Sequence, residues 1–256
     1  MELITSRQNP LCLHFRRLAS SRAYRAERGE FLCDSPKLLE EAVRWGAPIR
    51  AVLHTQGVQL PPLPGGPDVR RAQVTESVMR SVSPMETPQG VVFSCRMPER
   101  PLPERLEPGR YLVLDGVQDP GNAGTILRTA DAFDCGPVFL LPGCADLYNP
   151  KTLRAAMGVH FRRPVCSCTL EALCALLREA GLPLYAAALG EDAADVRELD
   201  LSRCAVAVGS EGRGVSPQVL AACRRTVKIP MSPRCESLNA AAAAAVLLWE
   251  MARAEL

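Results

Sequence analysis

Residues 111–229 alternate between short apolar runs and helical patterns, and this alternation restricts the possible fold more than any other feature. Five runs have the length and composition of buried strands: 111–114, 138–141, 184–187, 205–208 and 227–229. Helical patterns lie between most of them, at 125–133, 169–180 and 217–223. Continuously apolar strands are buried on both faces, and strands separated by helices are usually parallel. The sequence therefore predicts an α/β fold with a mostly parallel sheet and helices on both faces.

Residues 98–110 separate this region from the residues before it. Closely spaced prolines exclude a helix or a central strand there, and most of the other residues are charged. We therefore expect a linker at 98–110 between a smaller α/β domain, 1–97, and a second domain, 111–256. The first domain is expected to contain a helix starting near Ser35-Pro36, with an apolar stripe that reaches Trp45. Its other expected elements are strands at 49–54 and 91–93 and a loop at 61–67.

Composition excludes several classes of protein. Of the 256 residues, 47% are hydrophobic and 23% charged, which is typical of globular proteins. No apolar run approaches the roughly 18 residues of a membrane span, and the first residues lack the pattern of a signal peptide. Eleven cysteines, an odd number, in a chain of this size favour reduced thiols in the cytoplasm over a disulfide scaffold. The cysteine spacing and only three histidines indicate no metal site.

Basic residues concentrate near the N-terminus, although the whole chain has a net charge of only +2. Residues 7–28 contain six arginines and a single acid, Glu27. Guanidinium groups suit phosphate oxygens, so this stretch is a candidate nucleic-acid contact. A solvated helix face carries the same pattern, and charge alone does not separate the two interpretations.

Ligands of open parallel sheets bind beyond the carboxyl ends of the strands. After the first predicted strand, residues 115–128 contain glycines and a proline that form a tight turn, and Asn122 is expected to cap the next helix. Arg128 lies roughly two turns further on. The segment lacks the Gly-x-Gly-x-x-Gly pattern of dinucleotide-binding folds. A capped helix with a surface arginine would also explain it.

Residues 209–214, after the fourth predicted strand, contain three glycines around one carboxylate, Glu211. A turn between a strand and a helix would explain one glycine. Three glycines allow the backbone to approach a ligand closely. We therefore expect a ligand-binding loop at this strand end.

Residues 229–239 follow the fifth predicted strand, and six alanines come directly after them. Two prolines interrupt the chain, and Ser237 is expected to cap a helix that ends near Ala254. Ser237 and Asn239 would then lie at a helix N-terminus, where N–H groups suit a polar ligand. The alanines permit close helix packing, in a core or at a dimer interface, so packing alone also explains the segment.

In this order, the three segments resemble the motifs of the SpoU/TrmH RNA ribose 2′-O-methyltransferases of the SPOUT superfamily. The matching residues are 122–128, 209–214 and 229–239, and residues 149–158 resemble the stretch after the family's second strand. The resemblance covers residues 111–254. Residues 1–97 resemble, less closely, the ribosomal-protein-like domain with which many members bind substrate RNA.

The resemblance implies an enzyme that transfers the methyl group of S-adenosylmethionine to a ribose 2′-hydroxyl of RNA. It also implies a deep trefoil knot and a homodimer whose active sites draw on both subunits. The residues implied to be catalytic are Asn122, Arg128, Glu211, Ser237 and Asn239. Those implied to bind the cofactor are Gly209, Ile229, Met231 and Leu238. The expected RNA contacts are Arg7, Arg16, Arg17, Arg22, Lys151 and Arg154.

The chemistry of this transfer suits the implied residue types. A 2′-hydroxyl must be aligned with the methyl group, and the donor carries its own positive charge, so the reaction needs no metal. Arg128 could hold a phosphate and stabilise a developing alkoxide, whereas a guanidinium resists deprotonation and is a poor base. Many relatives have a hydroxyl residue where this chain has Ala241, so one hydrogen bond of those relatives is missing.

Ribosomal RNA is the favoured substrate, because tRNA enzymes of the family often have short helical extensions in place of the first domain. A tRNA 2′-O-methyltransferase, a non-catalytic RNA-binding protein of the same fold and an unrelated nucleotide-handling enzyme remain as alternatives. The complete set of implied catalytic residues favours an active methyltransferase.

Overall fold

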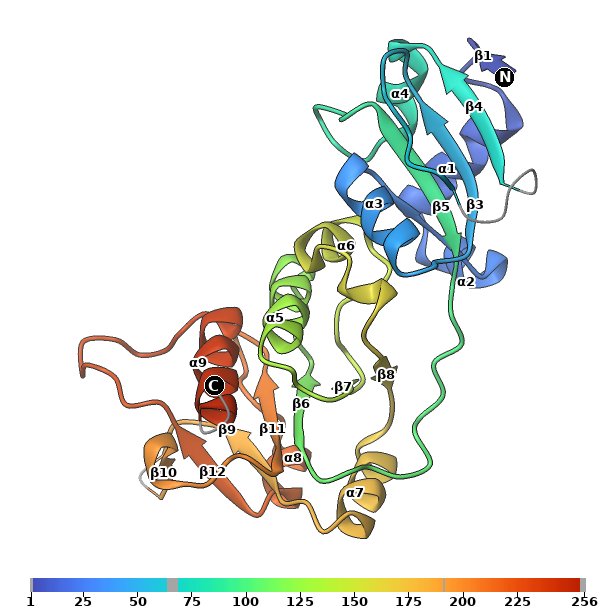
Figure 1. Ribbon diagram of the computed structural model, residues 1–256. Helices are drawn as coiled ribbons and strands as arrows, with labels where there is room; N and C mark the ends of the chain where they lie inside the picture. The colour runs from blue at the N-terminus through green and yellow to red at the C-terminus, as the bar shows by residue number, and fades with distance from the viewer. Residues whose placement is uncertain (1, 64–68, 191, 254–256) are drawn as a thin grey trace. The chain divides into compact units, whose positions relative to one another are not determined.

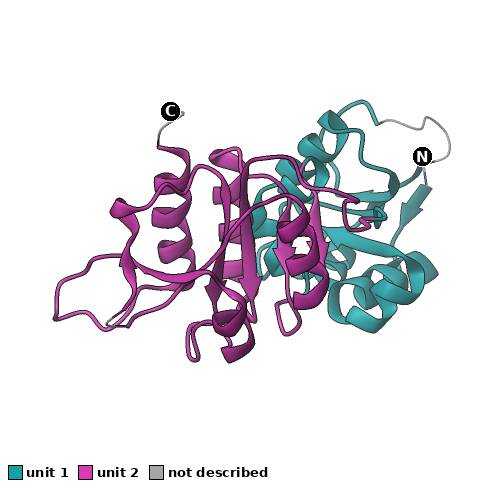
Figure 2. Cartoon of the chain, turned by 90° about the horizontal axis from the view of Figure 1, so that it is seen from below, with its two compact units in different colours: residues 1–99, 146–162 teal, residues 100–145, 163–256 magenta. Residues whose placement is uncertain are grey.

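A computed structural model describes residues 2–63, 69–190 and 192–253 (Figure 1). The chain forms two compact units (Figure 2): Met1–Glu99 with Asp146–Arg162, and Arg100–Ala145 with Arg163–Leu256. We call them the first and the second unit. The predicted domain boundaries differ from this division, because they place residues 146–162 in the second domain. Residues 64–67 of the expected loop at 61–67 lie outside the described part of the chain.

The first unit contains a five-stranded sheet. In spatial order its strands are β1 (Glu2–Ile4), β4 (Arg70–Val74), β3 (Ile49–His54), β5 (Val91–Arg96) and β2 (Glu30–Cys33). The first three strands are parallel, whereas β5 runs antiparallel to β3 and β2. The strands predicted at 49–54 and 91–93 are therefore confirmed.

Helices cover both faces of this sheet. They are α1 (Pro10–Ser20), α2 (Arg22–Arg28), α3 (Pro36–Arg44) and α4 (Glu76–Val82). Helices α1 and α4 bury Phe15 and Met79 against one face, and α3 packs on the other face around Phe93. The Ser35 hydroxyl caps α3, accepting a 3.1 Å hydrogen bond from the N–H of Leu38. Trp45 follows the end of α3 and is 46% exposed, so its expected place in the apolar stripe is wrong.

Residues 146–162 belong to the first unit because specific contacts hold them there. They form α6 (Pro150–Ala156) and a short 3₁₀ helix, η2 (Val159–Phe161). Leu153 joins the apolar core around Phe93, and the Tyr148 ring lies 4.8 Å from the ring of Phe31. Three ion pairs add to this packing: Arg25–Asp146 at 2.5 Å, Arg154–Asp34 at 2.5 Å and Arg162–Glu41 at 3.0 Å. The partners lie more than 100 residues apart in the sequence, so no local pattern predicts them.

Asp34 makes the stability of the first unit depend on pH. Its side chain is 1% exposed, and burial raises its pKa from 3.8 to about 6, although Arg154 opposes the shift. The folded protein thus holds this proton more tightly than the unfolded chain does. The favourable contribution is complete below pH 3.8 and is lost as the pH rises to about 6.

We expect the free energy of unfolding of the wild type, relative to Asp34→Asn, to fall by roughly 1–3 kcal/mol between pH 4 and pH 6. Urea denaturation at a series of pH values measures this difference. Glu86→Gln, which changes an exposed carboxyl group of the same unit, serves as the control. A difference between wild type and Asp34→Asn that stays constant with pH would contradict the assignment.

The second unit contains a seven-stranded sheet in which every pair of neighbours is parallel, which confirms the predicted fold class. In spatial order the strands are β10 (Ala194–Asp195), β12 (Arg225–Lys228), β9 (Leu184–Ala187), β11 (Cys204–Gly209), β6 (Arg110–Asp115), β7 (Val138–Leu140) and β8 (Val165–Ser167). Only the short edge strands β8 and β10 were not predicted. Residues 100–109 of the expected linker are anchored to this unit, since Leu106 is buried in its core.

Both faces of the second sheet are covered. The helices are α5 (Pro120–Ala132), α7 (Leu170–Glu179), α8 (Pro217–Ala222) and α9 (Ala240–Ala252), with a 3₁₀ helix η3 (Val196–Glu198). Helices α7 and α8 pack through Leu173 and Val219 on the face that carries Val113 and Ala207. Side chains alternate along a strand, so the residues before and after Val113 and Ala207 point to the opposite face of the sheet, which α5 and α9 cover. Helix α9 contacts both α5 and β11 (Figure 1). Within the described residues, no helix is long and apolar enough to cross a bilayer.

Candidate active site

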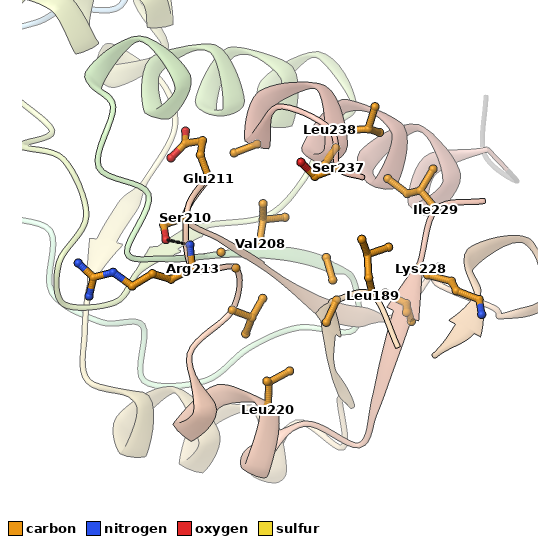
Figure 3. Close-up of a pocket in the computed structure, with 18 of the residues that line it drawn as sticks. Leu189, Val208, Ser210, Glu211, Arg213, Leu220, Lys228, Ile229, Ser237 and Leu238 are labelled. Carbon is orange, nitrogen blue, oxygen red and sulfur yellow. Dashed lines mark hydrogen bonds between the residues drawn. The ribbon is translucent and has the colours of Figure 1, made fainter. Parts of the chain in front are cut away.

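A cavity of about 420 Å³ lies at the carboxyl ends of β9, β11 and β12, which are neighbours in the sheet (Figure 3). Its walls come from the segments that follow these strands and from the first turns of α9. The lining includes Leu189, residues 208–211, residues 213–215, Ile229, Met231, Ser237, Leu238 and Ala240. Small-molecule sites commonly enclose roughly 300–1,000 Å³ and are mostly apolar, as this lining is. The predicted ligand-binding loops at 209–214 and 229–239 therefore border one cavity.

The glycine loop is closed on itself. The N–H of Ser210 donates to the carbonyl of Gly214 at 3.1 Å, and the N–H of Gly214 donates back at 2.9 Å. A Cβ atom at Gly209 would lie 2.0 Å from the carbonyl carbon of Gly214 and 2.2 Å from the nitrogen of Val215. A residue without a Cβ at position 209 therefore allows the end of β11 to lie directly against the backbone of Gly214 and Val215. At the loop exit, the N–H of Ser216 donates to the Asp115 carboxylate at 2.6 Å.

The caps of α5 and α9 differ from the prediction. Asp119 caps α5, since its carboxylate accepts a 2.8 Å hydrogen bond from the N–H of Asn122 and Pro120 occupies the first turn. The expected cap at Asn122 is therefore wrong, and its side chain is available for other contacts. Asn239, instead of Ser237, caps α9: its Oδ1 accepts from the N–H groups of Ala241 at 2.9 Å and Ala242 at 3.3 Å.

A chain of hydrogen bonds links the three motifs. Because Asn239 Oδ1 accepts the two helix N–H groups, its Nδ2 donates to Asn122 Oδ1 at 3.2 Å. The Nδ2 of Asn122 then donates to Oε1 of Glu211. The α9 cap thus fixes the orientation of both amides. This chain, which we call the Asn239–Asn122–Glu211 relay, holds the Glu211 carboxylate at the cavity.

Three of the five predicted catalytic residues form this relay, a fourth lines the cavity, and Arg128 does neither. Ser237 lines the cavity with Glu211, near α5 and α9 (Figure 3). Arg128 lies six residues after Asn122, which is roughly 240° around the helix axis. Its side chain is exposed and makes no hydrogen bond or ion pair with any described residue. Within one chain, the guanidinium of Arg128 therefore stands apart from the relay.

All four residues predicted to bind the cofactor line the cavity: Gly209, Ile229, Met231 and Leu238. Sequence reasoning missed Leu189 and Leu220, which line the cavity while 60% and 37% exposed. Leu189 follows β9, the strand between β11 and β12, so its position at a strand end was the available signal. An isolated leucine carries no chemistry of its own and therefore does not by itself indicate a site.

The predicted RNA contacts all lie in the first unit, with varied surroundings. Arg7 donates to the Ser77 hydroxyl at 3.2 Å, Arg16 donates to the Arg7 carbonyl at 2.6 Å, and Arg17 lies 3.9 Å from the Tyr24 ring centroid. The side chains of Arg22 and Lys151 are exposed.

Two basic residues of the expected RNA surface have structural partners. Arg25, part of the arginine-rich stretch, is 3% exposed and pairs with Asp146. Arg154 pairs with the buried Asp34. A cation that compensates a buried carboxylate is costly to remove from it, so these contacts disfavour the expected RNA role of Arg154.

The parallel sheet, the cavity at three strand ends and the relay define an α/β domain that binds a small ligand next to a fixed carboxylate. Residues 109–249 match the family model described as "SpoU rRNA Methylase family", and residues 9–92 match "MRM3-like substrate binding domain". The chain belongs to the SpoU rRNA methylase family, and the predicted family is confirmed.

Several relatives extend along nearly the whole chain. The 23S rRNA (guanosine(2553)-2′-O)-methyltransferase RlmP of Bacillus subtilis is 34% identical over 98% of this chain and 99% of its own length. A 23S rRNA (uridine(2479)-2′-O)-methyltransferase of Streptomyces viridochromogenes is 30% identical, covering 98% of this chain and 91% of its own. The crystal structure of an AdoMet-bound rRNA methyltransferase from Sinorhizobium meliloti matches with a TM-score of 0.87 and 28% identity, covering 100% and 98% of the two chains.

Proposed function

We propose that this protein uses S-adenosylmethionine to methylate a ribose 2′-hydroxyl of ribosomal RNA. The observation that carries the proposal is the Asn239–Asn122–Glu211 relay, which joins the three motifs beside a cavity in a chain of the SpoU family. Relatives that cover nearly the whole chain are named as 23S rRNA 2′-O-methyltransferases. This similarity supports ribosomal RNA over tRNA.

The cavity suits the cofactor. Val208, Ile229 and Leu238 offer apolar contacts for an adenine ring, and the backbone groups of the glycine loop offer polar contacts. Two similar proteins, from Sinorhizobium meliloti and Streptomyces viridochromogenes, have crystal structures with AdoMet. When bound, the cofactor supplies an electrophilic methyl group on a sulfonium ion.

The relay aligns the acceptor hydroxyl in this proposal. Glu211, oriented by Asn122, accepts a hydrogen bond from the 2′-hydroxyl and holds its oxygen in line with the methyl group. As the oxygen–methyl bond forms and the methyl–sulfur bond breaks, the hydroxyl proton passes to the Glu211 carboxylate. Ser237 donates a second hydrogen bond from the other wall of the cavity. The negative charge that develops on the oxygen requires a cation, and Arg128 supplies it.

We further propose that the protein is a homodimer and that Arg128 acts in the partner's active site. Arg128 is exposed and stands apart from the relay of its own chain. Helix α9 presents Val246 and Trp249, 40% and 50% exposed, and the Trp249 ring lies 5.8 Å from that of Phe133 just after α5. An exposed apolar surface on a helix that contacts α5, the helix that carries Arg128, suits a subunit interface.

The chain path also supports the trefoil knot that the family resemblance implies. Strand β12 lies beyond β9 in the sheet, yet the helix that follows it, α9, packs on β11 and α5. Residues 229–239 must therefore return past the ends of β9 and β11, and we propose that this return forms the knot.

The eleven cysteines are free thiols, which supports the expected location in the reducing cytoplasm.

Titration calorimetry with S-adenosylmethionine tests the proposal. We expect one binding site per chain, with no comparable heat from ATP as the control ligand. Absence of binding at millimolar cofactor would exclude the methyltransferase. Binding of ATP alone would instead favour another nucleotide-handling enzyme.

A further inference from the structure

The glycine loop presents two charged side chains, and the relay uses only one of them. Glu211 and Arg213 lie within the segment closed by the hydrogen-bonded pair Ser210–Gly214. The N–H of Arg213 also donates to the Ser210 hydroxyl at 3.3 Å (Figure 3). The paired backbone of Ser210 and Gly214 therefore places both charged residues on one short loop at the cavity.

Arg213 differs from the paired arginines of the second unit. Arg163 bonds with Asp131 at 2.6 Å and also with Asp134, and Arg197 bonds with Asp195 at 2.6 Å. The Arg213 guanidinium has no such partner among the described residues. Arg213 lines the cavity and is exposed, and Figure 3 shows its side chain extending away from Ile229 and Leu238. Its charge therefore faces solvent at the rim, outside the apolar part of the cavity.

An RNA ribose that reaches Glu211 brings phosphates with it on both sides. The Glu211 carboxylate repels these phosphates, so a cation nearby is needed to hold the strand in place. A guanidinium presents a fork of donors that matches the oxygens of a phosphate. We propose that Arg213 binds the RNA phosphate next to the methylated ribose and so positions the strand over Glu211. The inference rests on the proposed RNA methyltransferase function and adds a residue that positions the substrate.

RNA binding without turnover tests this inference. The probe is unmodified Bacillus subtilis 23S rRNA transcribed in vitro, and the variants are Arg213→Ala, Arg213→Lys and Arg203→Ala. Arg203 is an exposed arginine that directly precedes β11, so it controls for loss of one charge at the opposite end of the same strand. Filter binding at several salt concentrations gives the dissociation constant and its salt slope. Calorimetry gives the affinity for S-adenosylmethionine.

We expect Arg213→Ala to weaken RNA binding about tenfold and to lower the salt slope by roughly 0.7–0.9, which corresponds to one phosphate contact. Cofactor affinity should stay within about twofold of wild type, because the guanidinium extends away from the apolar part of the cavity. Arg213→Lys should restore part of the RNA affinity, since it keeps the charge without the fork.

Equal RNA binding by Arg213→Ala and wild type would overturn the inference. So would an equal loss in Arg203→Ala, which would indicate only a general charge effect, or weaker cofactor binding in Arg213→Ala. Failure of the proposed function has a different signature, namely wild-type protein that transfers no methyl group to any RNA. The binding measurement would still decide whether Arg213 contacts RNA in that case.

Discussion

Arg128→Ala is expected to lower the rate of methyl transfer by roughly 100- to 1,000-fold or more while leaving the protein folded. A cation that stabilises a developing oxyanion contributes on this scale. Arg128 is exposed and has no polar partner within the described part of the chain, so the substitution disturbs no internal contact. Single-turnover transfer of labelled methyl from S-adenosylmethionine to RNA measures the rate. Thermal unfolding confirms that the variant is folded.

Mixed dimers show which subunit's site Arg128 serves. We would mix Arg128→Ala with Glu211→Ala, two variants that are each inactive alone. If Arg128 acts across the interface, every mixed dimer has one site with both native residues, and a random mixture regains about one quarter of wild-type activity. If the mixture stays as inactive as its components, Arg128 acts within its own chain or the protein does not exchange subunits. A size-exclusion assay of tagged subunits separates those two outcomes.

Gly209→Ala is expected to abolish measurable S-adenosylmethionine binding. The added Cβ would lie 2.0 Å from the carbonyl carbon of Gly214, so the Ser210–Gly214 pair must open. Opening it displaces Glu211 and the loop that borders the cavity, and such overpacking costs about 1–3 kcal/mol or more. Calorimetry measures the loss of cofactor binding.

Gly190→Ala is the matched control for this substitution. Gly190 also follows a strand of the second sheet, but a Cβ there would have no atom within 4 Å. Wild-type cofactor affinity is expected for the control. If Gly209→Ala bound the cofactor as tightly as wild type, the glycine loop would not form the cofactor site.

The sequence predicted the second sheet because its strands are buried. The central strands β6, β9 and β11 are continuously apolar, which is a local and strong signal. The edge strands β8 and β10 have only three and two residues, and each includes a polar residue, so neither has the apolar composition that marks the equally short β7. In the first unit, β4 begins with the exposed pair Arg70 and Arg71 and does not have the composition of a strand.

The candidate site was predicted as a set of residues but not as a geometry. Local chemistry identified Asn122, Glu211 and Asn239. It did not show that Asp119 caps α5, a contact that leaves the Asn122 amide available to join the other two. The direction of each hydrogen bond in the relay follows from the α9 cap, and this cap depends on where the helix begins. The separation of Arg128 from Asn122 could have been predicted from the sequence, because two side chains six residues apart on a helix lie on different faces.

Local sequence patterns could not predict that residues 146–162 pack with the first unit. Arg25 and Arg154 belong to clusters of basic residues that suit RNA, and only their buried partners Asp146 and Asp34 reveal a structural role. Long-range ion pairs leave no trace in spacing or composition. The same contacts leave Arg7, Arg16, Arg17, Arg22 and Lys151 as the predicted RNA surface of the first unit.

The most direct test of the central claim identifies the methylated atom. Purified protein would be incubated with methyl-labelled S-adenosylmethionine and unmodified 23S rRNA, and the RNA digested to nucleosides for mass spectrometry. We expect label in a 2′-O-methylated nucleoside, and none with Glu211→Ala. Label on a nucleobase, or no transfer by a protein that binds the cofactor and RNA, would contradict it.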